Sequence, residues 1–175
     1  MNNEINGIPV ETLENRLRPD PDQKSRFHSA SGFIGNDDRL LEVLDRDNQI
    51  VNEKKLSHLE LAQPLEKIVN LVLSENFYEG QSIVISDQTF IVSMEYFMGY
   101  QESPFEDGLK GNIDITVTRE RDKKIILFSM ILPEFIKRYG FYEGNVRYRV
   151  APETIIEFFN LAPEENINHQ PRSAV

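Results

Sequence analysis

The stretch NIDITVTRERDKKIILFSMI, residues 112–131, contains two apolar runs joined by a charged turn. In the first run Ile113, Ile115 and Val117 alternate with polar residues, which is the period of a half-buried β-strand. The second run, residues 125–131, is apolar on both faces, which is typical of a strand in the middle of a sheet. The stretch therefore predicts two consecutive strands of one sheet.

Two further strands are predicted before this stretch. QSIVIS and QTFIVSMEYFM are separated by a short polar step around Asp87, which favours a β-hairpin. Residues 89–98 are apolar on both faces and are also expected in the middle of the sheet. The segment between Tyr100 and Gly111 contains proline and glycine and is expected to be a loop.

Helices are predicted on the N-terminal side of the strands. Residues 37–47 have leucines on one side and Asn36 or Asp37 as a candidate N-cap. The sequence SHLE, which begins at Ser57, matches a capping box, and Pro64 is expected to break or kink the helix that follows. An apolar stripe at helical spacing is the strongest helix signal in the chain: Leu61, Leu65, Ile68, Val69 and Val72.

The C-terminal part predicts a helix, a short strand and a last helix. LPEFIKRYG has a proline suited to the first helical turn and Gly140 suited to a left-handed C-terminal residue. NVRYRV alternates, which predicts a strand with Arg147 and Arg149 on its outer face. The last helix begins at Pro152. The tetrapeptide FYEG precedes this strand and also occurs at residues 77–80; we interpret the two copies as similar helix-to-strand junctions.

The order of these elements predicts an α+β fold, a mostly antiparallel sheet of about four to five strands with helices packed on one face. Residues 1–35 contain several prolines and no sustained apolar period, so we expect an irregular N-terminal arm. A single α+β domain over residues 36–162 and a C-terminal tail over residues 163–175 complete the expected organisation.

Composition limits the classes of partner and chemistry. The net charge of −10 argues against nucleic acid and anionic membrane as general partners. The chain has no cysteine, which excludes disulfides, thiolate zinc sites and a thiol nucleophile. Its first residues lack the basic start and apolar stretch of a secretory signal, so a cytoplasmic location is expected.

Candidate catalytic and metal-binding residues do not group in the sequence. The three histidines, His28, His58 and His169, are far apart, and the acids between residues 45 and 56 lack the glycine and glutamate of a calcium loop. The familiar phosphate-binding and serine-nucleophile motifs are absent from the sequence. We therefore predict no catalytic residue, no metal and no cofactor, while paired carboxylates from different strands remain open.

Charge is distributed unevenly along the chain. Residues 61–118 carry nine acids and two bases, whereas residues 119–149 carry eight bases and four acids. The basic segment contains the candidate partner-binding residues Arg138, Arg147 and Arg149, whose guanidinium groups suit carboxylates. The competing interpretation is that these arginines pair with acids of the same chain.

Two functional hypotheses follow. The favoured one is a non-catalytic cytoplasmic module that binds a protein partner or self-associates as a homo-oligomer. The alternative is a small enzyme or small-molecule-binding protein with a pocket of carboxylate, tyrosine and arginine side chains between sheet and helices. Nucleic-acid binding through the basic segment is a third hypothesis, and its mark would be an affinity that falls steeply with salt.

Overall fold

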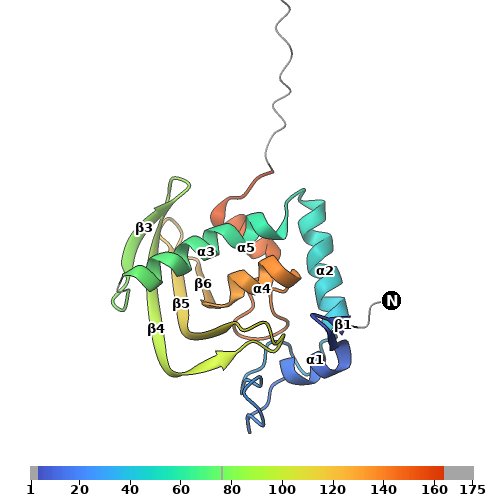
Figure 1. Ribbon diagram of the computed structural model, residues 1–175. Helices are drawn as coiled ribbons and strands as arrows, with labels where there is room; N and C mark the ends of the chain where they lie inside the picture. The colour runs from blue at the N-terminus through green and yellow to red at the C-terminus, as the bar shows by residue number, and fades with distance from the viewer. Residues whose placement is uncertain (1–3, 76, 164–175) are drawn as a thin grey trace, which may run out of the picture.

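The computed structural model describes residues 4–75 and 77–163, and Figure 1 shows their arrangement. Its centre is an antiparallel sheet in the order β3–β4–β5–β6. The strands are β3 (Gln81–Ile85), β4 (Gln88–Glu102), β5 (Lys110–Arg119) and β6 (Ile125–Ser129). The expected α+β class with a mostly antiparallel sheet is confirmed.

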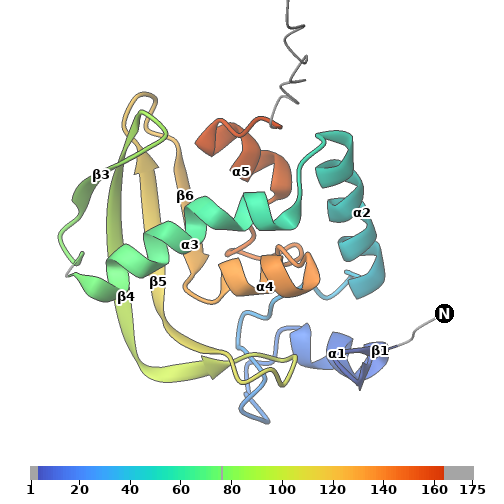
Figure 2. The ribbon, with the colours of Figure 1, turned by 45° about the horizontal axis from the view of Figure 1, so that its top comes forward.

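Helices lie on one side of this sheet, as the two views of the ribbon show (Figures 1 and 2). They are α1 (Val10–Leu17), α2 (Leu40–Glu53), α3 (His58–Ser74), α4 (Leu132–Tyr139) and α5 (Pro152–Phe159). A separate small hairpin, β1 (Glu4–Ile5) and β2 (Ile8–Pro9), precedes α1. None of the described helices combines the length and apolar character needed to cross a membrane.

The predicted hairpin around Asp87 is present as β3 and β4. Ile85 pairs with Gln88, so Ser86 and Asp87 form a two-residue turn with φ of 48° and 62°. Positive φ at both central residues is the geometry of the turn type that matches the twist of a hairpin. The polar Ser-Asp pair therefore sets the register of the first two strands.

The predicted positions of the strands within the sheet need correction. The 125–131 run was expected in the middle, but β6 is an edge strand that pairs only with β5, and Ile125 is 62% exposed. β4 is central, yet its second half is exposed, and Met98 is 99% exposed. Apolar residues on both faces predicted full burial of both strands. The structure instead leaves part of β6 and the second half of β4 exposed.

Helix α3 confirms the capping box and the buried stripe. The Ser57 hydroxyl accepts from the Glu60 amide, while the Glu60 carboxylate accepts from the Ser57 amide. The stripe residues from Leu61 to Val72 are buried in the main core against the sheet. The expected break at Pro64 is wrong, since α3 continues through it. Packing of the stripe on both sides of Pro64 outweighs the loss of one backbone hydrogen bond.

The N-terminal segment differs from the irregular arm expected for residues 1–35. Leu13 and Leu17 of α1 are fully buried, and they join Phe135 and Phe141 in a second core. Ring contacts extend this core, for example between Phe33 and Phe135 with centroids 5.8 Å apart. Only about two turns of helix carry the apolar residues, too short a segment to produce a sustained period in the sequence.

Helix α2 begins three residues after the position expected for it. Neither Asn36 nor Asp37 caps it; instead the carboxylate of Glu14 on α1 accepts a hydrogen bond of 2.9 Å from the Leu40 amide. Asp38 accepts from the Gly35 and Asn145 amides at 2.7 and 2.6 Å. The acids near this helix therefore bind backbone from other segments, which local spacing does not predict.

At the C-terminal side, α4 and α5 form as predicted. Gly140 closes α4 in the left-handed conformation with φ of 61°, and Phe141 after it is fully buried. Asn160 closes α5 in the same conformation. The expected tail from residue 163 lies almost wholly outside the described residues.

Candidate functional site

Arg147 and Arg149 do not lie on the predicted strand. The segment of residues 145–150 is a loop, and the Gly144 amide just before it donates to the Phe33 carbonyl at 2.7 Å. Arg138 pairs with Glu134 on its own helix at 3.1 Å. Arg147 is exposed, with its guanidinium 5.5 Å from the ring of the neighbouring Tyr148.

Arg149 fixes the loop that follows α4 to helix α2. Its two terminal nitrogens donate to the two oxygens of Asp47 at 2.9 and 2.7 Å, and Asp47 is fully buried. One of these nitrogens also donates to the Glu143 carbonyl. Such a bidentate pair fixes geometry as well as charge, so Arg149 positions the backbone around Glu143.

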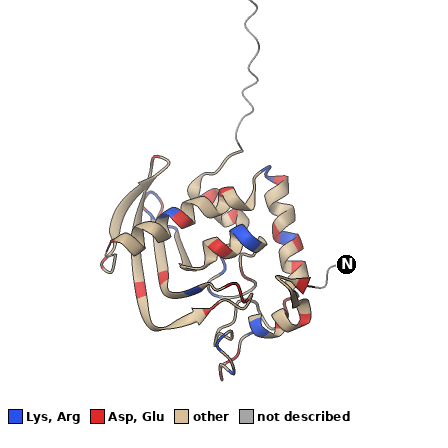
Figure 3. Cartoon of the chain, in the orientation of Figure 1, with Lys and Arg blue, Asp and Glu red and all other residues tan. Residues whose placement is uncertain are grey.

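Most other cations of the basic segment also have acidic partners within the chain. Figure 3 shows acidic and basic residues interspersed on α4, where Lys137 lies 2.5 Å from both Glu66 and Glu134. Arg119 is fully buried and binds Asp122 and Glu157 at 2.6 and 2.7 Å. Intramolecular pairing therefore accounts for much of the uneven charge seen in the sequence.

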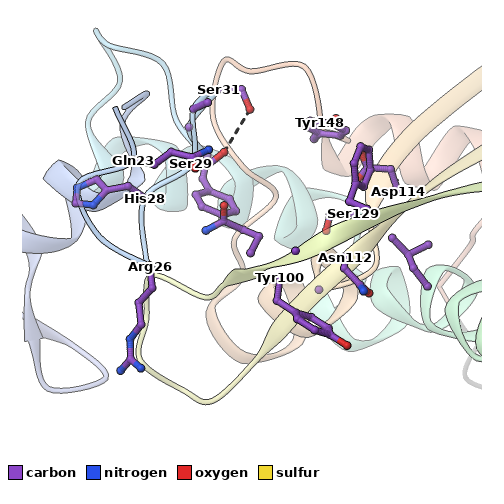
Figure 4. Close-up of a pocket in the computed structure, with 18 of the residues that line it drawn as sticks. Gln23, Arg26, His28, Ser29, Ser31, Tyr100, Asn112, Asp114, Ser129 and Tyr148 are labelled. Carbon is purple, nitrogen blue, oxygen red and sulfur yellow. Dashed lines mark hydrogen bonds between the residues drawn. The ribbon is translucent and has the colours of Figure 1, made fainter. Parts of the chain in front are cut away.

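A cavity of about 570 Å³ lies where β4 and β5 approach the N-terminal segment, and Figure 4 shows its lining. The lining comes from the loop between residues 23 and 33, from β4 (Phe97, Gly99, Tyr100, Gln101), from β5 (residues 111–114), from Ser129, and from Glu143 and Tyr148. β4 changes register between Tyr96 and Gln101, where it bends toward this loop (Figure 2). The irregularity of β4 thus opens the space at this end of the sheet.

Glu143 is the most unusual residue of the cavity. It is 2% exposed, and its Oε2 atom is buried without a hydrogen-bond partner. Its φ of 65° lies in the left-handed region, which costs a glutamate energy. Burial raises the pKa of Glu143 to about 8; Asp114 raises it further and Arg149 opposes the rise. At neutral pH the side chain is therefore mostly protonated.

The backbone around Glu143 has little freedom to relax. A Cβ atom at Gly144 would lie 2.3 Å from the Asp38 carboxylate and 3.0 Å from Ile34, so this position requires glycine. The same Asp38 carboxylate accepts from the Asn145 amide. Together with Arg149, these contacts hold Glu143 in a conformation that its side chain does not favour.

Asp114 on β5 provides a second acid to the cavity. Burial raises the pKa of Asp114, a hydrogen bond from the Tyr148 hydroxyl lowers it, Glu95 raises it and Arg147 lowers it. Burial, together with the interaction with Asp114, raises the pKa of Tyr148 to about 12. Figure 4 shows Asp114 beside Tyr148, with Ser129 next to them. An acid and a tyrosine therefore lie side by side in the lining of the cavity.

The basic groups of the lining are engaged elsewhere. Arg26 lies 3.3 Å from Glu102 and 4.9 Å from the ring of Phe27. The ring of His28 bonds the Ser25 hydroxyl at 2.7 Å. Figure 4 shows both side chains directed away from the group formed by Asp114, Ser129 and Tyr148. The acidic side of the cavity thus has no cation of the lining directed at it.

Metal and cofactor chemistry have limited support in the part of the chain that the structure describes. Within it, no three or more histidine or acidic side chains form a group suited to a metal ion. His58, half-buried at the start of α3, instead bonds the Tyr142 hydroxyl at 2.8 Å and Asn48 at 3.2 Å. His169 lies outside the described residues.

Sequence reasoning noticed the tetrapeptide that contains Glu143 but missed the residue itself. The available signal is a glutamate placed between two aromatic residues and a glycine, in a segment whose other residues are predicted to face the core. The partnership of Asp114 with this loop is not visible in the sequence, because the two lie on separate elements.

The chain was compared with known protein families, curated proteins and solved structures. No protein-family model, no curated protein and no solved structure matches the chain. The function therefore has to be argued from the site alone.

Proposed function

We propose that this protein binds a small organic molecule in the cavity between the end of the sheet and the loop of residues 23–33, with Glu143 as its principal polar contact. This is the alternative hypothesis from the sequence rather than the favoured one. The observation that carries the proposal is Glu143, a residue that lines a cavity of about 570 Å³ and whose buried Oε2 atom has no hydrogen-bond partner.

A buried carboxyl oxygen without a partner is costly, which is why buried polar groups in folded proteins are nearly always hydrogen-bonded. A ligand in the cavity would supply the missing partner. The strained φ of Glu143 supports the same interpretation, because such conformations persist where the surroundings enforce them and concentrate at binding sites.

The size and lining of the cavity also support a small-molecule ligand. Its volume falls in the range of ordinary ligand pockets, and it combines aromatic walls with a few polar groups. A strongly raised carboxyl pKa beside a second acid is typical of functional clefts.

The test is a screen of a metabolite library by thermal melting, followed by calorimetry of each compound that stabilises the protein. We expect at least one compound to bind saturably to the unmodified chain and at least tenfold more weakly to Glu143→Gln. Glu79→Gln, which changes the exposed glutamate of the other FYEG copy, is the control and should bind as the unmodified chain does. Hits that bind both variants equally well would contradict the proposal, as would a library without a single binder.

Protein binding remains a second candidate because of one observation on β4. Tyr96, Phe97, Met98 and Tyr100 are all exposed in a short stretch next to the cavity, and apolar groups gathered on a surface often mark contacts. Light scattering across a range of concentrations tests self-association. A dimer that dissociates in Met98→Glu would favour protein binding through this surface. A monomer at all concentrations would exclude self-association. Arg147→Glu measured alongside tests the predicted arginine site.

A further inference from the structure

We infer that the ligand carries a positively charged amine, which pairs with the carboxylates of Glu143 and Asp114 and is enclosed by the aromatic rings of the cavity. The inference rests on the proposed function and adds the chemical class of the ligand. It follows from which polar groups of the cavity already have partners and which do not.

The lining of the cavity contains two acidic side chains. Glu143 and Asp114 both border it, and Oε2 of Glu143 has no hydrogen-bond partner. The Arg149 guanidinium bonds the Glu143 carbonyl and both oxygens of Asp47, and its charge lowers the pKa of Glu143 without giving Oε2 a hydrogen bond. Once Glu143 is ionised, its carboxylate accepts hydrogen bonds and does not donate them, so an ammonium group would satisfy both the charge and the hydrogen bond of the ionised side chain.

An anionic ligand fits the same surroundings poorly. Arg26 and His28, the basic residues of the lining, have partners and are directed away from Asp114 (Figure 4). An anion placed in the cavity would further disfavour the ionisation of Glu143 and Asp114, whose pKa values burial already raises. Wherever these acids are ionised, they repel an anion in a partly buried site, so the lining disfavours carboxylates and phosphates.

Two tyrosines of the lining already lie near cations: Lys110 Nζ is 4.8 Å from the Tyr100 ring, and the Arg147 guanidinium is 5.5 Å from the Tyr148 ring. Phe33 and Phe97 also contribute to the walls and are the rings that we expect to meet a ligand cation. The faces of phenylalanine and tyrosine rings attract ammonium groups, and more strongly where water is excluded. A compact amine with an apolar or aromatic body would place its body against these rings and its charge against the acids.

Binding of an amine changes the protonation of Glu143. Below pH 8 the free protein holds Glu143 mostly protonated, and an ammonium group stabilises the carboxylate, so the proton leaves to solvent as the amine binds. The charged groups that face Glu143 are Asp114 from β5, Arg149 from its own loop, and Asp38, which binds the next turn of the loop. His28 borders the same cavity from the 23–33 loop.

The affinity for an amine should therefore rise with pH. Between pH 6 and pH 8 the increase approaches about tenfold per pH unit, and it levels off above the pKa of Glu143. Near pH 7 calorimetry in phosphate and in Tris should give enthalpies that differ by the release of about one proton per amine bound.

The experiment uses the full chain and matched probes. Tyramine supplies an aromatic amine, 4-ethylphenol supplies the same ring without the charge, and 3-(4-hydroxyphenyl)propionate supplies the opposite charge. Phenethylamine and agmatine extend the amine series. We expect at least one amine to bind at least tenfold more tightly than its neutral or anionic counterpart, with the pH dependence described above.

Two variants provide the control on the site. Glu143→Gln and Asp114→Asn should each weaken amine binding at least tenfold. Glu143→Gln should also abolish the rise of affinity with pH. Glu79→Gln should change neither the affinity nor its pH dependence. Melting curves identify a variant that does not fold, and the pH and buffer dependence of the unmodified chain decides the matter independently of any variant.

The outcomes separate the two proposals. If library compounds bind through Glu143 but are neutral or anionic and the amines do not bind, the amine inference is overturned and the proposed function stands. If neither the amines nor any library compound binds, both are overturned. Amine binding without proton release also contradicts the inference, because the charge would then lie away from Glu143.

Discussion

The tetrapeptide FYEG occurs at residues 77–80 and again at residues 141–144, and the two copies have different surroundings. The phenylalanine is buried in both. The tyrosine and the glutamate are exposed in the first copy and buried in the second, as the pairs Tyr78 and Tyr142, Glu79 and Glu143 show. Identical local sequence thus gives a surface turn in one place and the centre of a cavity in the other.

The difference comes from residues distant in the sequence. The second copy is fixed by Asp38 before α2 and by Asp47 within it, the latter through Arg149. It also packs on α1 and α4 through Phe141 in the second core. The first copy leads directly into β3, whose pairing with β4 satisfies the backbone without enclosing the side chains. Contacts with distant segments therefore determine whether the glutamate of this tetrapeptide is exposed on the surface or buried at the cavity.

Replacing the tyrosines should produce the largest contrast between the copies. Tyr142→Ala removes a fully buried ring and a hydrogen bond to His58, so we expect it to lower the free energy of unfolding by about 3–5 kcal/mol. Tyr78 is 55% exposed, and Tyr78→Ala should cost less than about 1 kcal/mol. Urea denaturation measures both. Equal losses would mean that the two copies do not differ in packing as described.

The second copy should also depend on the N-terminal segment. Leu13→Ala leaves a cavity in the second core and should cost about 2–5 kcal/mol, whereas the exposed Thr12→Ala on the same helix should change stability by less than about 0.5 kcal/mol. Amide exchange should accelerate more in residues 141–144 than in 77–80. Unchanged exchange in Leu13→Ala would restore the expectation of an arm separate from the domain.

The pH dependence of stability should be affected by the second glutamate. The pKa of Glu143 is raised from 4.5 to about 8, so the native state retains a proton that the unfolded state loses above about pH 4.5. Its contribution to stability is lost as pH rises toward 8. The stability of Glu143→Gln relative to the unmodified chain should therefore increase by up to about 1.4 kcal/mol per pH unit between pH 5 and 7.5.

Denaturation curves across this pH range measure that difference, and other titrating groups cancel in it. The exposed Glu79→Gln should change stability by less than about 0.5 kcal/mol at every pH. A difference between Glu143→Gln and the unmodified chain that does not vary with pH would show that Glu143 titrates alike in both states.

The smallest effect is expected at Arg147, which flanks the second copy. Arg147 is exposed, and Arg147→Ala should alter the free energy of unfolding by less than about 0.5 kcal/mol. Arg149→Ala, two residues later, leaves buried Asp47 without its bidentate partner and should cost several times more. Thermal melts of the two variants compare them directly. A large loss in Arg147→Ala would assign a structural role to this side chain as well.

Periodicity predicted most of the regular structure. The β3–β4 hairpin, the alternation along β5, the buried stripe of α3 and the Gly140 closure of α4 all depend on neighbours within a few residues. The sequence predicted secondary structure less well where contacts with distant residues determine it. Glu14 caps α2 from another helix, α1 is too short for a clear period, and the bonds of Arg149 to Asp47 replace the expected strand.

The residues of the candidate site could not be identified from the sequence, because contacts between distant segments bring them together. A pocket of carboxylate, tyrosine and arginine side chains between sheet and helices was an open alternative. The cavity lies instead between the end of the sheet and the loop of residues 23–33, and its acids come from β5 and from the loop after α4. The predicted arginines were near it in sequence, and one of them, Arg149, supports the site without facing the cavity. A spacing rule cannot identify a pair that only tertiary packing brings together.

The most direct test of a binding role for Glu143 is the titration of its carboxyl by ¹³C NMR, with the signal assigned by its loss in Glu143→Gln. We expect a midpoint near pH 8 in the free protein, and we expect it to fall when tyramine is added. A midpoint near the ordinary value of 4.5 would mean that this carboxyl is solvated or already paired, and would contradict the claim that it awaits a ligand.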